Sequence, residues 1–135
     1  MADKLSVARR SANMRAIRSK DMKPELVVRS AAHAMGYRFR LHRRTLPGKP
    51  DLAFAGRQKV IFVHGCFWHQ HAGCQDGRMP RSSIAYWRPK LRRNIRRDTE
   101  HLAALKAGGW KVLVIWECET VDERRLRLRL QRFLG

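Results

Sequence analysis

The chain has 135 residues, and its 30 Lys or Arg against 11 Asp or Glu give a formal net charge of +19. Its 44% hydrophobic residues are enough to form a core, which excludes a disordered protein, and its length fits one domain. No apolar run reaches the roughly 18 residues of a membrane-spanning helix, and residues 1–20 are too polar and basic for a secretory signal. The excess positive charge favours nucleic acid as the partner over a membrane surface.

The first two predicted elements are helical. Residues 1–20 are basic and carry a weak apolar stripe, which fits either a solvated surface helix or an arm that enters a nucleic acid groove. Residues 23–35 predict a helix with Asp21 as its cap, Glu25 in its first turn and Gly36 as its stop.

Three short strands are predicted next. Residues 37–42 alternate between apolar and basic side chains, as in a strand with one solvated face. Residues 51–55 and 59–63 are apolar runs joined by residues 56–58, which predicts a hairpin.

The second half predicts an irregular segment, a long helix, a strand and a last helix. Residues 64–82 are rich in His, Cys and Gly and have no periodicity. A helix over 83–107 contains Pro89, where a break is possible, and residues 110–116 predict a strand buried on both faces. A basic helix follows at 122–133. The order predicts an α/β fold, with a mixed sheet flanked by helices in a single domain, residues 1–135.

Cysteine and histidine residues are concentrated in residues 64–74. Cys66, His71 and Cys74 follow a C-x4-H-x2-C spacing, and Cys118 comes just after the last predicted strand. Three cysteines and one histidine form a complete tetrahedral zinc set, and such a closed site is structural. The alternative is three unrelated thiols and a surface histidine. Because three cysteines cannot pair completely as disulfides, we expect a reducing compartment, the cytosol or bacterial nucleoid.

Asp51, His64 and His69 are candidates for chemistry. A histidine titrates near neutral pH and can take a proton from water, although a lone histidine is more often a packed or surface group. Asp51, at the start of a predicted strand, fits either a carboxylate that binds Mg²⁺ beside a phosphate or a turn aspartate after proline.

Aromatic side chains fall into two groups. One lies among residues 64–82 and in the stretch 78–97, which has eight Lys or Arg and no acid; this composition is typical of a surface that stacks on bases. The other lies on the last predicted strand and is assigned to the core. The first group is Phe67, Trp68, Tyr86 and Trp87, and the second is Trp110 and Trp116.

Four motifs together resemble one family. They are RSANMRAI (10–17), LPGKPD (46–51), VHGCFWHQH (63–71) and WKVLVIWEC (110–118). In this order they resemble the very short patch repair (Vsr) DNA mismatch endonucleases. The resemblance implies a restriction-endonuclease-like fold with a structural zinc and Mg²⁺-dependent nicking of double-stranded DNA 5′ of the T in a T:G mispair. It also implies a link to a cytosine DNA methyltransferase and to mismatch repair proteins; one active site per chain predicts a monomer.

The resemblance carries over roles residue by residue. Asp51 resembles the metal-binding carboxylate, assisted by the backbone carbonyl of Val63, and His69 resembles the general base. The remaining roles are supporting active-site residues (Glu25, His64), an outer member (Asp98), zinc ligands (Cys66, His71, Cys74, Cys118), an aromatic wedge (Phe67, Trp68, Trp87) and further DNA contacts (Met14, Arg15, Lys49).

Two departures and two rivals accompany this hypothesis. Related nuclease folds usually carry Glu-x-Lys where this chain has Phe62-Val63-His64, but the Vsr branch lacks Glu-x-Lys too. The second departure is Val63, which stands where that branch has a threonine. If the metal binds the backbone carbonyl, valine is harmless there. The rivals are a non-catalytic, zinc-stapled DNA-binding module and a nicking endonuclease of the same fold with another lesion or duplex specificity.

Overall fold

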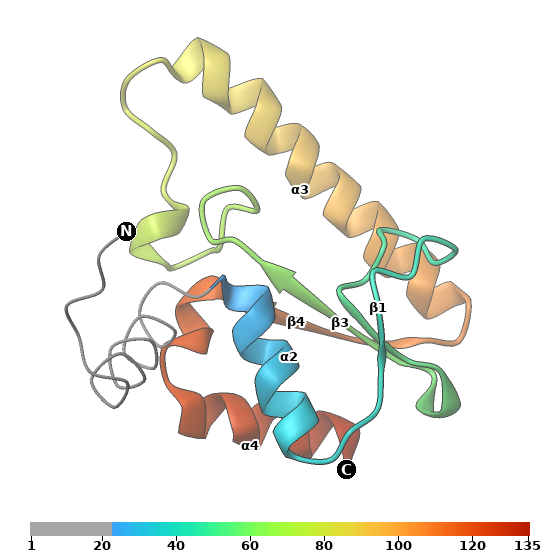
Figure 1. Cartoon of the computed structure of the whole chain (residues 1–135). Helices are drawn as coiled ribbons and strands as arrows, with labels where there is room; N and C mark the ends of the chain where they lie inside the picture. The colour runs from blue at the N-terminus through green and yellow to red at the C-terminus, as the bar shows by residue number, and fades with distance from the viewer. Residues whose placement is uncertain (1–22) are drawn as a thin grey trace, which may run out of the picture.

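A computed structural model describes residues 23–135, so the predicted arm and the predicted cap Asp21 lie outside the described residues (Figure 1). The order of helices and strands is the predicted one. The elements are α2 (Pro24–Ala34), β1 (Arg40–Leu41), β2 (Leu52–Phe54), η1 (Ala55–Arg57), β3 (Lys59–His64), η2 (Gln75–Gly77), α3 (Ile84–Ala107), β4 (Lys111–Trp116), η3 (Glu117–Thr120) and α4 (Glu123–Leu134). In this part of the chain, no helix has the length and apolar character needed to cross a membrane.

The strands form one mixed sheet in the order β1-β2-β3-β4. β1 and β3 both pair antiparallel with β2, and Leu52 lies opposite Ile61. β3 and β4 are parallel along their whole length, from Lys59 opposite Lys111 to His64 opposite Trp116. A parallel pair needs a crossover, which α3 provides. The crossover brings the irregular segment after β3 next to the residues that follow β4.

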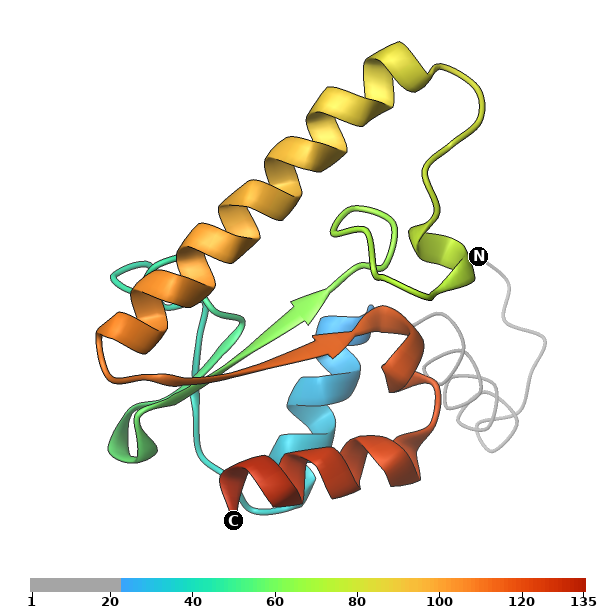
Figure 2. The ribbon, with the colours of Figure 1, turned by 180° about the vertical axis from the view of Figure 1, so that it is seen from behind.

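Helices cover both faces of the sheet (Figure 2). α2 and α4 lie on one face, where Val28, Ile61 and Leu126 belong to the larger core cluster. On the other face Leu105 of α3 packs with Phe62 in a smaller cluster. The alternating side chains of β3 therefore divide between the two cores, as the pleat of a strand requires.

Helix ends follow the predicted signals where these are described. Pro24 occupies the first turn of α2, where a missing N–H costs nothing, and Gly36 has the positive φ of 87° that ends many helices. The side chain of Asp122 caps α4 by accepting a hydrogen bond from the Arg125 N–H at 3.2 Å.

Two strand predictions need correction. Only residues 40 and 41 of the predicted strand 37–42 pair with β2, because the Tyr37 N–H donates to the carbonyl of Ala32 at the end of α2. β4 contacts both cores, but Ile115 is its only buried residue, since no strand of the described residues covers its outer edge. A strand with both faces packed can thus stay half-exposed along an open edge.

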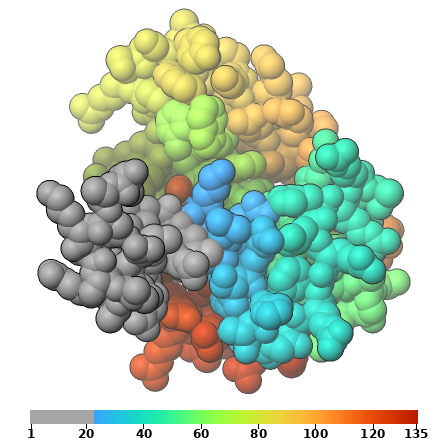
Figure 3. Space-filling model, in the orientation of Figure 1, coloured from blue at the N-terminus to red at the C-terminus, as the bar shows by residue number. Residues whose placement is uncertain are grey.

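α3 runs without a break through Pro89. The proline removes one backbone donor in the second turn, where the surrounding residues are exposed and water can satisfy the freed carbonyl. Leu91 and Leu105 are the only buried residues of the helix. Its first turns stand away from the sheet (Figure 1), and the space-filling view shows them above the irregular segment that follows β3 (Figure 3).

Candidate active site and metal centre

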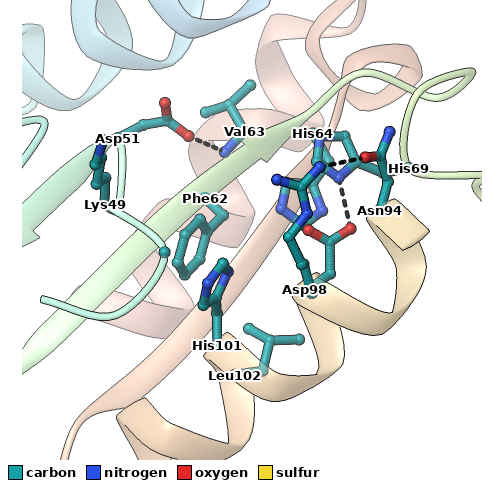
Figure 4. A pocket seen from close by; sticks show the side chains of 12 residues that line it. Lys49, Asp51, Phe62, Val63, His64, His69, Asn94, Asp98, His101 and Leu102 are labelled. Carbon is teal, nitrogen blue, oxygen red and sulfur yellow. Dashed lines mark hydrogen bonds and ion pairs between the residues drawn. The ribbon is translucent and has the colours of Figure 1, made fainter. Parts of the chain in front are cut away.

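A cavity of about 320 Å³ lies between β3 and α3 (Figure 4). The loop before β2, strand β3, the segment that follows it and one side of α3 form its walls. The fold therefore brings together side chains that are more than fifty residues apart in sequence. Six residues predicted from the sequence line it: Lys49, Asp51, Val63, His64, His69 and Asp98.

Asp51 faces the backbone of β3. Because Asp51 directly precedes β2, which pairs with β3, its Oδ2 can accept a hydrogen bond from the Val63 N–H at 2.6 Å. Burial raises the pKa of the Asp51 carboxyl, the Val63 hydrogen bond lowers it, and the nearby Glu25 raises it again, leaving it above the usual value. A carboxylate that is costly to ionise in this position is stabilised by a bound cation.

His69 is held by an acid from α3. Its Nδ1 lies 2.5 Å from Oδ2 of Asp98, and since a carboxylate only accepts hydrogen bonds, we assign the ring proton to Nδ1. Nε2 then keeps its lone pair, as a base requires. The His64 ring stacks on His69 with centroids 3.9 Å apart. Burial, followed by the neighbouring His69, lowers the pKa of His64 to about 4, so His64 is neutral at pH 7.

Glu25 lies near Asp51, and a residue that the sequence analysis missed, His42, lies beside both of these acids. His42 Nε2 lies 2.6 Å from Glu25 Oε1, and His42 Nδ1 lies 4.0 Å from Asp51 Oδ1. The His42 N–H also donates to the carbonyl of Asp51 at 3.2 Å. Pairing the predicted strands 37–42 and 51–55 would have placed these two residues opposite each other.

The four predicted zinc ligands lie together. One donor atom from each of Cys66, His71, Cys74 and Cys118 lies within 4.8 Å of all the others. His71 Nδ1 is 3.7 Å from the Cys66 Sγ and 3.5 Å from the Cys118 Sγ. Cys118 reaches the cluster because β4 runs parallel to β3 and ends beside it. The segment after β3 is thereby tied to the segment after β4.

The thiols of this cluster differ in acidity. Burial raises the pKa of Cys66 to about 12 and also raises the pKa of Cys118, whereas a hydrogen bond from the Asp76 backbone lowers the pKa of Cys74. A metal binds thiolates, so binding here releases protons. Gly77 allows the tight fold of the segment, because a Cβ at this position would lie 2.3 Å from the carbonyl oxygen of His71.

One aromatic prediction was wrong. Trp116 is not a core residue: its ring stacks on the imidazole of His71, with centroids 4.2 Å apart and planes inclined by 10°. Since β4 is an edge strand, the side chain at its end faces the metal cluster. Trp110 does pack against the smaller core, as predicted.

The other aromatic residues form an exposed cluster between the segment after β3 and the start of α3. Phe67 and Trp68 contact Trp87 edge-on, with centroids 5.2 and 5.8 Å apart. Trp68 is 46% exposed and Tyr86 is 60% exposed. Lys90 Nζ lies between 5.5 and 5.9 Å from three of these rings, a cation–π arrangement. An exposed apolar cluster beside a basic helix is typical of a surface that contacts DNA bases.

Comparisons with known proteins identify the family. A family model described as DNA mismatch endonuclease Vsr matches residues 2–75. The chain is 52% identical over 134 residues to the type II nicking enzyme V.XorIIP of Xanthomonas oryzae pv. oryzae, covering 99% of this chain and 98% of the relative. It is 37% identical over 139 residues to the DNA mismatch endonuclease Vsr of Escherichia coli, covering 99% and 88%. The chain belongs to the Vsr family.

Membership in the Vsr family confirms the predicted resemblance and makes this protein a DNA endonuclease that acts on mismatched DNA. The mixed sheet flanked by helices agrees with the restriction-endonuclease-like fold that the resemblance implied. A non-catalytic DNA-binding module is therefore the wrong alternative.

Further residues of α3 face the cavity of this Vsr protein, although the sequence analysis did not select them. Asn94, Arg97 and His101 line it together with Asp98, since residues three or four apart share one face of a helix. Asn94 Nδ2 donates to the carbonyl of Trp68 at 3.0 Å and so joins α3 to the aromatic cluster. A search for polar residues at helical spacing around Asp98 would have found them. Met14 and Arg15, predicted to contact DNA, lie outside the described residues.

Proposed function

We propose that this Vsr protein nicks one strand of double-stranded DNA on the 5′ side of the T in a T:G mispair, in a Mg²⁺-dependent reaction. The observation that best supports this proposal is that Asp51 and the hydrogen-bonded pair His69–Asp98 border one cavity. The exposed aromatic cluster lies beside that cavity, because Asn94 of α3 lines the cavity and donates to the carbonyl of Trp68; Arg97 of the same helix also lines it. Such a nick would begin the repair of a deaminated 5-methylcytosine.

The residues around Asp51 fit a divalent cation. Burial disfavours the ionised Asp51, and Glu25 Oε1 is a buried oxygen that accepts no hydrogen bond from residues 23–135. Asp51 and the backbone carbonyl of Val63 would hold Mg²⁺, with Glu25 nearby; oxygen donors are those that this cation prefers. Bound Mg²⁺ supplies charge neutralisation at the scissile phosphate and at the leaving oxygen.

The protein's own groups move the proton. His69 Nε2 accepts a proton from the attacking water, and Asp98 stabilises the resulting imidazolium through its contact with Nδ1. The neutral His64 ring stacked on His69 adds no positive charge and fixes the plane of the imidazole. Asp98 and His64 thus act through His69.

We further propose that the aromatic cluster recognises the mispair. A mispaired step is easier to unstack than a matched one, so inserting Phe67, Trp68 and Trp87 costs about a few kcal/mol and less at a mispair than elsewhere. Met14, Arg15 and Lys49 add contacts to the DNA, the first two from the basic arm of a single domain that spans residues 1–135.

One site per chain supports a monomer that cuts one strand. The proposed setting is the bacterial cytoplasm and nucleoid, with a cytosine methyltransferase and mismatch repair proteins as functional partners.

The cluster of three cysteines and His71 would hold a structural Zn²⁺. Its donor set is the one that zinc prefers, and four protein ligands leave no position for a reacting water. The raised pKa values of Cys66 and Cys118 keep these two thiols protonated at pH 7 in the absence of metal, so metal binding there would release their protons.

Strand-specific cleavage across a panel of substrates tests the proposed specificity. We expect nicking of T:G duplexes in Mg²⁺ and at least about 100-fold slower nicking of the same duplex with a matched T:A pair, because inserting the aromatic wedge costs more free energy at a matched pair than at a mispair. The alternative is another lesion or sequence, which the names of relatives such as the nicking enzyme V.XorIIP keep open. Equal rates on T:G and matched duplexes would support that alternative.

We expect Asp98→Asn to slow nicking by about 100- to 10,000-fold while leaving DNA binding unchanged. An asparagine amide that donates to Nδ1 would hold the ring proton on Nε2, where His69 could no longer act as a base. Single-turnover nicking and a binding isotherm on T:G duplex check this result. Glu100→Gln is the control: it also removes one negative charge, but from an exposed residue of α3, and this variant should nick at the wild-type rate. A fully active Asp98→Asn protein would exclude the proposed role.

Binding should depend steeply on salt. If the +19 chain neutralises about 8 phosphates, the logarithm of the association constant falls with the logarithm of salt concentration at a slope of about −7. Fluorescence anisotropy with a labelled T:G duplex between low and moderate salt measures the slope. A response that is flat in salt would rule out the electrostatic contacts.

A further inference from the structure

His42 lies beside the two acids of the proposed cation site and has not been given a role. It follows β1 with a positive φ of 46°, which is uncommon for a residue other than glycine. Its backbone N–H is fixed by the Asp51 carbonyl, and its side chain is 52% exposed at the edge of the site. The imidazole is therefore held near both acids while it remains open to solvent.

The contact between His42 and Glu25 involves a buried oxygen that has no donor hydrogen from the described part of the chain aimed at it. Nε2 lies 2.6 Å from Glu25 Oε1, yet that buried oxygen accepts no hydrogen bond from any residue between 23 and 135. A neutral imidazole nitrogen and a carboxylate oxygen each carry a lone pair that a cation can bind. A cation held by both would give the buried Glu25 oxygen a partner. One donor atom from each of Glu25, His42 and Asp51 lies within 4.8 Å of the other two.

The second mixed cluster next to the cavity does not need a cation in the same way. It consists of His64, His69 and Asp98. There the His69 Nδ1 and the Asp98 carboxylate form a hydrogen bond, and the His64 ring packs against His69 and Trp116. The Asp98 Oδ2 there has a hydrogen-bond partner, whereas the buried Glu25 Oε1 has none among residues 23–135.

We propose that His42 is a nitrogen ligand of the divalent cation that Asp51 and Glu25 bind, and that the site consequently binds Mn²⁺ more tightly than Mg²⁺. The inference rests on the proposed function, in which Asp51 is a metal ligand. Mg²⁺ strongly prefers oxygen donors, whereas an imidazole nitrogen favours first-row transition metals. One nitrogen among oxygen donors therefore shifts the preference toward Mn²⁺ and still permits Mg²⁺ to bind.

Mn²⁺ binding to the full-length, zinc-loaded protein tests the proposal without any measurement of nicking. The loss of the free Mn²⁺ signal in electron paramagnetic resonance gives the affinity, and electron spin echo modulation detects a directly bound ¹⁴N. We expect a nitrogen coupling in the wild type. His42→Gln should remove that coupling and weaken Mn²⁺ binding about tenfold, with a smaller change for competing Mg²⁺. His33→Gln, the same change at an exposed position on α2, is the matched control and should behave as wild type.

The variants separate failure of this inference from failure of the proposed function. If His42→Gln keeps the nitrogen coupling and wild-type Mn²⁺ affinity, His42 is not a ligand. If the coupling is instead lost in His69→Gln, the cation lies in the other cluster, and the inference is likewise overturned. If Asp51→Asn still binds Mn²⁺ at wild-type affinity, Asp51 is not a metal ligand and the proposed function itself fails.

Discussion

Replacing Asp51 by asparagine should reduce the rate of nicking by at least about 10,000-fold, because the neutral amide cannot hold the cation that neutralises the reacting phosphate. The fold should be unaffected. The amide oxygen of asparagine can still accept the hydrogen bond that the Val63 N–H donates to Asp51 Oδ2. Single-turnover nicking of a T:G duplex, together with thermal unfolding of the metal-free protein, measures both properties.

Asp51→Asn should not lower the free energy of unfolding of the metal-free protein. Since the folded state raises the pKa of Asp51, the native protein holds that proton more tightly than the unfolded chain. The carboxyl therefore destabilises the native state as pH rises from its ordinary pKa of 3.8 through the raised pKa, and the cost persists at pH 7. Asparagine removes this cost, so the metal-free variant should unfold at the wild-type temperature or above it.

Two controls make the Asp51 result specific. Glu100→Gln removes the same charge from an exposed position of α3 and should leave nicking unchanged. Mispaired-duplex binding in the absence of divalent cations should be the same for Asp51→Asn and wild type. A variant that nicks within about tenfold of the wild-type rate would contradict a metal-binding role for Asp51.

Local sequence patterns were sufficient for the order of elements and for the cluster of three cysteines and His71. The end of α2 at Gly36 and the turn between β2 and β3 depend on residues that are close in sequence, so local sequence patterns can predict them. The C-x4-H-x2-C spacing is also local. Only the parallel pairing of β3 with β4 was needed to bring Cys118 to the other three ligands.

Contacts between distant elements explain what the sequence did not reveal. His42 gains its position from pairing with Asp51 and from the approach of Glu25 on α2, and a pattern within residues 37–42 contains neither. Trp116 looked like a core residue because its strand is apolar, whereas its place at the end of an edge strand turns it toward His71. The side of α3 that faces the cavity likewise depends on how the helix packs on the sheet.

Removing zinc should destabilise the protein more than any single change on its surface. The segment after β3 contains one short 3-10 helix, η2, and Cys66 is its only buried residue before α3 begins, so apolar burial cannot hold it in place. A zinc ion held by the four proposed ligands would link this segment to Cys118, which lies in η3 just after β4. We expect Cys118→Ser or a chelator to cost about 3 kcal/mol, or roughly 10 °C in the unfolding temperature.

Three measurements together test the zinc prediction. Metal analysis of the purified protein should find one zinc per chain in the wild type and none in Cys118→Ser. Hydrogen exchange should show faster exchange in residues 64–82 of the variant, and its aromatic cluster should lose mispair binding because Phe67 and Trp68 belong to this segment. Val121→Ser, a nearby change at a side chain that is 80% exposed, is the control and should keep both zinc and stability. A zinc-free protein that unfolds at the wild-type temperature would show that the four side chains do not depend on a metal.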